Sequence, residues 1–141
     1  MLREALFNRT PNPVVKKSLD ASMLRSRVIA NNIANVTTPG YRRVEVSFED
    51  ELRNALSSTR LKGSQTNNNH MRLGRSGVGD VNARAYKPND PTLPSGVNNV
   101  DIDMEMAKLA ETQIMFNYGL RFNQGTYRKL NASIQGRALP L

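Results

Sequence analysis

The fold is decided by residues 102–134, which read IDMEMAKLAETQIMFNYGLRFNQGTYRKLNASI. Alternate steps of four and three along this stretch reach ten positions, and eight of them are apolar. Such a heptad repeat is typical of a helix that packs in a coiled coil. The apolar positions form a seam made of Ile102, Met106, Leu109, Phe116, Leu120, Tyr127, Leu130 and Ile134. The sequence therefore predicts a C-terminal axial helix over residues 101–136.

Both ends of this helix carry the expected signals. Asp101, Asp103 and Glu105 lie at its start, where acidic side chains complement the helix dipole, and Gly136 follows its last seam residue. The i, i+2 spacing of the carboxylates does not suit a metal site on one helix face, and a calcium loop would need a Gly and a distant Glu. Gly119 inside the helix costs about 1 kcal/mol relative to Ala, so it predicts close approach of another helix, as does Gly125.

A second, shorter helix is predicted over residues 14–36. Its seam contains Leu19 and Ile29 but also Ser22 and Ser26, which keep the apolar face narrow and permit close backbone approach. The helix ends before Pro39-Gly40, which fits the centre of a type II turn because Gly supplies the positive φ.

The segment between the helices has weaker signals. Val44, Val46 and Phe48 alternate as in a short strand, and a short helix is predicted to follow up to residue 56. Residues 57–100 hold five Gly, three Pro, seven Asn and five Ser, which predicts a flexible insert with at most a few short strands.

The fold class predicted is therefore mainly α, with long N- and C-terminal helices pairing as a coiled coil around an irregular or weakly β insert. The divisions along the chain are a flexible N-terminal segment 1–13, an axial helix 14–36, a turn, extended segment and short helix 37–56, the insert 57–100, the second axial helix 101–136 and a tail 137–141.

The composition narrows the function. The 141 residues include no Cys and no Trp, which excludes disulfides, a Cys-based zinc site and a thiol nucleophile. No apolar run is long enough to span a membrane, and the N-terminus lacks the apolar core of a cleaved secretory signal. Because burying the apolar seams offsets only part of the backbone entropy lost in ordering the two helices, we expect neighbouring copies or partners to supply much of their stability.

Catalysis has no candidate residues. His70 is the only histidine and has a polar loop around it, and Gly74–Gly79 lacks the Lys-Ser/Thr ending of a phosphate-binding loop. We therefore expect no catalytic, cofactor-binding or metal-binding site, and a chain that is not an enzyme.

The net charge of +8 leaves a basic, helical nucleic-acid-binding protein as an alternative. Lys16-Lys17 and Arg42-Arg43 are isolated pairs rather than a stripe, and few aromatic side chains are available for stacking, which argues against it. Steeply salt-dependent DNA binding would identify this alternative.

The end of the first helix is rich in asparagine. Asn31, Asn32 and Asn35 spread around the helix, and Asn is a poor interior helix former but a good capping residue. These side chains could form an ordinary helix stop, or they could bond backbone groups of adjacent chains. The residue types alone do not separate the two interpretations.

A resemblance favours one class of protein. The stretch ANNIANVTTPGYR (30–42), with SFEDEL (47–52) after it and NNVDIDMEMAKLAETQIMFNYGLRF (98–122) near the C-terminus, resembles the bacterial flagellar rod, hook and axial protein family. The resemblance covers roughly residues 14–56 and 96–137. It marks as an assembly motif Asn31, Asn32, Ile33, Ala34, Asn35, Pro39, Gly40 and Tyr41.

The resemblance implies a structural subunit of the flagellar basal body. Such a subunit would leave the cytoplasm through the flagellar type III apparatus without a cleaved signal, and would join the proximal rod, a hollow helical shaft across the periplasm that transmits motor torque. Its partners would be further copies of itself, the rod proteins FlgC and FlgF, and the rod adaptor FliE. Another rod subunit, of the FlgC type, is the alternative within the family.

Overall fold

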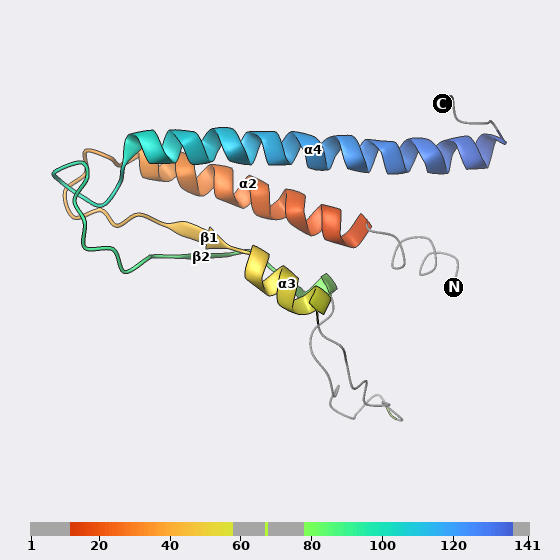
Figure 1. Ribbon diagram of the computed structural model, residues 1–141, viewed down its shortest axis with the longest axis horizontal. Coiled ribbons are helices and arrows are strands. Elements are labelled where there is room, and N and C mark those ends of the chain that lie inside the picture. The colour runs from red at the N-terminus through yellow and green to blue at the C-terminus, as the bar shows by residue number, and fades with distance from the viewer. Residues whose placement is uncertain (1–11, 58–66, 68–77, 137–141) are drawn as a thin grey trace.

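A computed structural model describes residues 12–57, 67 and 78–136 of the chain. Two long helices dominate it, α2 (Asn12–Ala34) and α4 (Ile102–Gln135). They lie side by side and antiparallel, with α4 the longer of the two (Figure 1). The mainly α fold with paired terminal helices is thus confirmed. The expectations for residues 1–11, for most of 58–77 and for the tail 137–141 lie outside the described residues.

The helix α2 ends earlier than its periodicity predicts. The seam pattern continues to Val36, but the helix stops at Ala34. Beyond it, Val36 N–H bonds to Ile33 O at 3.3 Å and Thr38 N–H to Asn35 O at 3.0 Å, so short turns replace the helical pattern. The Pro39-Gly40 turn follows as predicted, with Gly40 at φ 71° and Tyr41 N–H bonded to Thr38 O.

The glycine predicted to end α4 is confirmed as its cap, and Asp101, predicted only as a charge at the helix start, has a capping role as well. Asp101 is the N-cap, and its side chain accepts hydrogen bonds from the backbone N–H groups of Asp103 and Met104. Gly136 is the C-cap in the left-handed conformation at φ 65°, and its N–H bonds to carbonyls of the last turn. Free N–H and C=O groups at both helix ends are therefore satisfied locally.

The two helices approach each other closely at Gly119. A Cβ added there would lie 2.9 Å from Leu19 Cδ2, which is closer than real Cβ contacts allow. This confirms the reason inferred for a glycine inside the helix. A Cβ at Gly125 would meet no described atom within 4 Å, so that glycine has no such reason here.

The segment between the helices forms a third layer along α2 (Figure 1). Strand β1 (Glu45–Ser47) pairs antiparallel with β2 (Arg84–Tyr86), with Val46 opposite Ala85. The helix α3 (Glu49–Ser57) follows β1, and the short 3-10 helix η1 (Val78–Asp80) precedes β2. The second part of the insert is thus held in place by strand pairing, which its composition did not predict.

The apolar core of the described residues is small. Ala21 of α2, Phe48 and Val81 form one buried cluster, with Leu52, Ala55 and Ala83 packed against it. Val28, Ile29 and Val100 are the other buried apolar residues. Neither α2 nor α4 nor any other described helix combines the length and hydropathy that crossing a membrane requires.

Candidate assembly site

The asparagine-rich end of α2 is tied to its own chain. Asn32 is 0% exposed, and all of its side-chain contacts are internal. Its Nδ2 donates to Val44 O at 2.8 Å and to Glu105 Oε2 at 2.9 Å. Its Oδ1 accepts from Val44 N–H and from the Tyr41 hydroxyl, both at 3.0 Å. One side chain therefore joins the end of α2, the chain leaving the turn and the start of α4.

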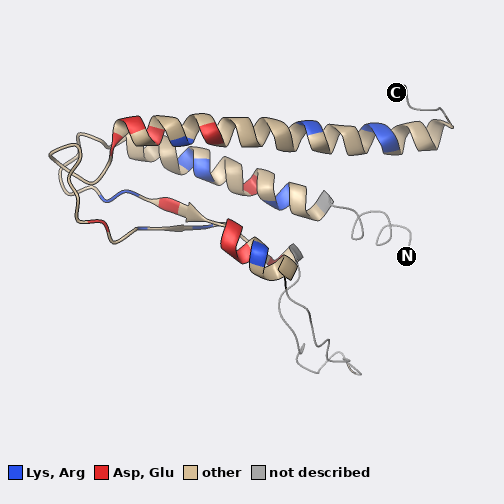
Figure 2. Cartoon of the chain, viewed as in Figure 1, with Lys and Arg blue, Asp and Glu red and all other residues tan. Residues whose placement is uncertain are grey.

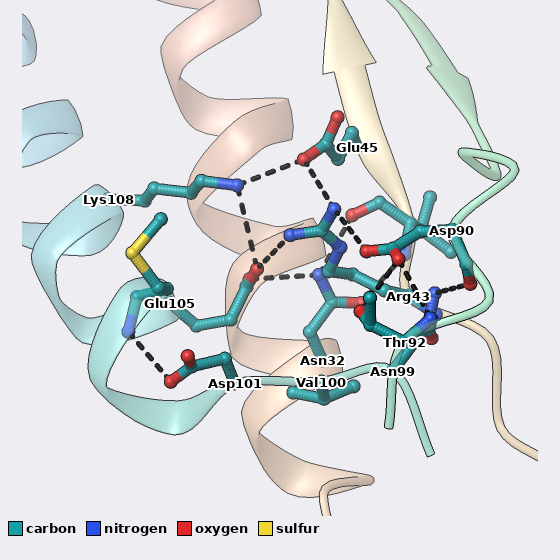
Figure 3. A network of polar contacts seen from close by, with 12 residues as sticks. Asn32, Arg43, Glu45, Asp90, Thr92, Asn99, Val100, Asp101, Glu105 and Lys108 are labelled. Carbon is teal, nitrogen blue, oxygen red and sulfur yellow. Dashed lines mark hydrogen bonds and ion pairs between the residues drawn. The ribbon is translucent and has the colours of Figure 1, made fainter. Parts of the chain in front are cut away.

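Glu105 is the buried centre of a partly exposed ionic network (Figure 3). It is 1% exposed, and its Oε1 lies 3.9 Å from Lys108 Nζ and 4.0 Å from an Arg43 nitrogen. Lys108 Nζ also donates to Glu45 Oε1 at 2.9 Å. Arg43 lies 3.3 Å from Glu45 and 3.5 Å from Asp90. The first turns of α4 are thus fastened to β1 and to the insert by side chains of alternating charge.

Asn98 and Asn99, just before α4, also bind the segment that follows α2. Asn98 Nδ2 donates to the backbone carbonyls of Asn35, Val36 and Thr38 at 2.9–3.0 Å, which gives partners to carbonyls beyond the end of α2. Asn99 Oδ1 accepts from Arg43 N–H at 2.7 Å. The two stretches that carry the family resemblance therefore bind each other within one subunit.

This arrangement revises the role expected for Asn32. The second interpretation, in which it bonds the backbone of an adjacent chain, does not fit a side chain that is buried and fully used within its own chain. Asn35 donates to Asn31 O, and both lie nearer the surface. The other motif residues are half-buried (Ile33, Tyr41) or exposed (Ala34, Pro39, Gly40).

The surface of α4 that contacts α2 is rotated from the predicted seam. Glu105 and Thr112 are buried and Gly119 touches Leu19, so one line of the helix with a spacing of seven faces inward. Ile29 is buried and Leu19 half-buried on α2. Of the seam on α4, the half-buried residues are Leu109, Phe116, Leu120 and Leu130, and the exposed ones are Ile102, Met106, Tyr127 and Ile134.

The inward line was missed because its residues are small or polar. A search for apolar periodicity passes over Glu105, Thr112 and Gly119, and the acidic side chain was interpreted only as a helix-start charge. The spacing of seven residues between Glu105, Thr112 and Gly119 is a signal that could have revealed this line, as could the small Ser22 on α2. Small inward side chains let the helices approach closely and leave the larger apolar side chains outside.

The outer surface of α4 is unusually apolar for a subunit in water. Ile114, Tyr118 and Phe122 follow each other at steps of four residues, and all are more than half exposed. Ile134, near the end of the helix, is 75% exposed. Contiguous exposed apolar side chains of this kind mark surfaces that bind other proteins.

A groove of about 400 Å³ lies between α2, β1 and α4. Its apolar lining consists of Val28, Ile29, Val44, Val46 and Met115. Its charged lining consists of Arg25, Glu45, Glu49, Glu105, Lys108 and Glu111, so carboxylates outnumber cations by two. Along α4 the acidic residues lie in the first half, whereas the basic residues of the second half have no acidic neighbours on the helix (Figure 2).

The network affects how several groups titrate. Burial favours a raised pKa for Glu45, but hydrogen bonds from Lys108 and Tyr86 and the charges of Lys108 and Arg43 outweigh it and lower the pKa. Burial, and then the charge of Glu105, raises the pKa of Tyr41. Hydrogen bonds from the Thr92 hydroxyl and backbone lower the pKa of Asp90.

Acid is therefore expected to destabilise the fold. The lowered pKa of Glu45 means that the unfolded chain binds more protons, so the stability it contributes is present above about pH 5 and is lost as pH falls through its folded pKa. Asp90 acts with the same sign. Thermal unfolding followed by circular dichroism at decreasing pH should show this. The variant Glu45→Gln should have a shallower pH dependence, and an identical slope would contradict the assignment.

Comparison with known proteins gives a consistent result. A family model for flagella basal body rod proteins matches residues 24–42, from the middle of α2 through the Pro39-Gly40 turn. The flagellar basal body rod protein FlgB of Bacillus subtilis is 30% identical over 122 residues, covering 86% of this chain and 91% of that protein. The FlgB of Borrelia hermsii is 33% identical, covering 83% and 90%. The FlgB of Aquifex aeolicus is 26% identical, covering 87% and 91%.

Proposed function

Because the chain belongs to the FlgB family of flagellar basal body rod proteins, we propose that it forms part of the proximal rod, at the base of a hollow helical shaft. The observation that carries the proposal is the surface of α4, where Ile114, Tyr118 and Phe122 are exposed. The helix pair encloses mainly small and polar side chains, so its larger apolar surface remains for neighbouring subunits. Such a subunit buries its apolar surface only when it assembles with others. The family is structural rather than enzymatic.

We propose export through the flagellar type III apparatus without a cleaved signal. The absence of Cys and the small apolar core support it, because a chain with few buried apolar side chains costs little to keep unfolded. In the assembled rod, many distributed helix contacts would transmit torque.

The partners proposed are further copies of the chain, FlgC and FlgF in the rod, and FliE at its base. A subunit between unlike neighbours needs several separate surfaces. The outer surface of α4, the groove and the exposed Pro39-Gly40 turn supply three on different parts of the molecule. The seam residues of α4 that are exposed, such as Met106 and Tyr127, are proposed to complete their contacts there.

The variant Phe122→Asp tests the proposal. Phe122 is exposed, so we expect the subunit to keep its fold while a charge enters an apolar interface, and rods and motility to be lost. Complementation of a deletion strain, with electron microscopy of purified basal bodies, measures both. The matched control is Gln113→Asp, at an exposed polar position of the same helix, which should leave motility unchanged. Normal rods with Phe122→Asp would count against the role of this surface.

A further inference from the structure

We propose that the groove between α2, β1 and α4 binds the projecting end of α4 from a second copy of this chain. The projecting end is defined as residues 127–135. This inference rests on the proposed function as a rod subunit and names one contact within it. Because it joins two different surfaces, the contact is head-to-tail and does not close, so it continues from copy to copy.

The lining of the groove has more carboxylates than cations. Arg25 pairs with Glu49 at 2.6 Å and Lys108 with Glu45 at 2.9 Å, and Glu105 is buried beside Lys108 and Arg43, so Glu111 is the lining carboxylate left for a partner's cation. Glu105 Oε1 is buried and accepts no hydrogen bond from any described residue. Glu111 is exposed and forms no ion pair with a described cation. A basic, partly apolar segment would therefore fit both the charge and the apolar lining.

The end of α4 has the matching properties. Leu19 lies against Gly119, so in the antiparallel pair the first residue of α2 lies opposite about residue 126 of α4. Figure 1 shows α4 continuing past the start of α2. This projecting part carries Arg128 and Lys129, and it exposes the apolar side chains of Tyr127 and Ile134. No acidic residue follows Glu111 in the chain.

The dimensions also agree. The groove follows α4 from Glu105 to Met115, eleven residues that span about 15 Å, and residues 127–135 span about 12 Å. The projecting end cannot enter its own groove, because Met115 and Tyr127 lie about 18 Å apart on the same helix. The contact must therefore come from another molecule.

Cysteine cross-linking tests the contact directly, since the chain has no Cys of its own. One chain carries Met115→Cys and the other Tyr127→Cys, and the two full-length proteins are mixed and oxidised. We expect a disulfide-linked dimer, since both positions are exposed and meet only in the proposed contact. The control pairs Tyr127→Cys with Gln113→Cys, which is exposed on another side of α4 and does not line the groove. Equal cross-linking of both pairs, or none of either, would overturn the proposal.

Charge reversal tests the chemistry. Adding Arg128→Glu and Lys129→Glu to the Tyr127→Cys chain should lower the yield of dimer roughly tenfold or more, because like charges then meet at the groove. Adding Glu111→Lys to the Met115→Cys chain should restore part of that yield. Unchanged cross-linking in the reversed chain would contradict the role of charge.

Incorporation into rods separates this inference from the proposed function. If the chain never enters basal bodies, the function as a rod subunit fails. If it enters them, and in cells Met115→Cys links to a different protein but not to Tyr127→Cys, then the groove binds another partner and the inference about a second copy fails.

Discussion

Replacing Glu105 with alanine is expected to lower the free energy of unfolding by about 1.5–3 kcal/mol, because it removes a buried carboxylate that accepts a hydrogen bond from Asn32, while Arg43 and Lys108 keep Glu45 as a partner. Asn32 Nδ2 would lose one of its two acceptors, and the Arg43 and Lys108 charges would lose a carboxylate within 4.0 Å. Thermal unfolding by circular dichroism measures the loss. Because the apolar core is small, a loss of this size should prevent rods from forming.

Two further variants make the result specific. Glu105→Gln keeps the shape and an acceptor for Asn32 but removes the charge, so it should fall between the wild type and Glu105→Ala. Glu111→Ala, at an exposed carboxylate about 1.7 turns along the same helix, should change stability by less than about 0.5 kcal/mol. If both alanine variants cost the same, the network does not hold α4 in place.

Asn98→Ala is expected to cost about 2–3 kcal/mol. The Asn98 amide donates to three backbone carbonyls that follow α2, and its Oδ1 accepts from Val100 N–H at 2.9 Å. Because the side chain is buried, Val36 O would lose its donor, whereas Asn35 O and Thr38 O would keep only the backbone N–H of Thr38 and of Tyr41, respectively. Hydrogen exchange should show faster opening of the end of α2, together with a lower melting temperature.

The isosteric variant Asn98→Asp sharpens this test. A carboxylate keeps the acceptor but presents negative charge to three carbonyl oxygens, so it should destabilise at least as much as alanine. Asn89→Ala, at an exposed asparagine of the same insert, is the matched control and should be nearly neutral. A mild effect of Asn98→Asp would mean that donation to the carbonyls is unimportant.

The elements were predictable because their signals are local. Seam periodicity, the acidic start of α4, Gly136 and the Pro39-Gly40 turn each act within a few residues, and each was found from the sequence. The pairing of β1 with β2 was not predictable from three-residue strands, since their partners lie far apart in the chain.

The contacts that join the end of α2 to the start of α4 were not predicted, for a related reason. Asn32 and Glu105 are separated by 73 positions, and nothing in either local pattern indicates the other. The predicted seam on α4 lies one residue after the line that actually faces α2, because apolar residues were assumed to face inward. In this subunit the inner surface is lined by small and polar side chains, and many of the larger apolar ones face outward.

The distance between these partners along the chain has a consequence for synthesis. A ribosome releases the first helix long before the residues that give it Asn98 and Glu105, so that helix stays without its final contacts until nearly the whole polypeptide has emerged. Closing so large a loop late in synthesis delays compaction. We therefore expect a nascent subunit to stay extended until nearly all of it has been made, as the proposed export requires.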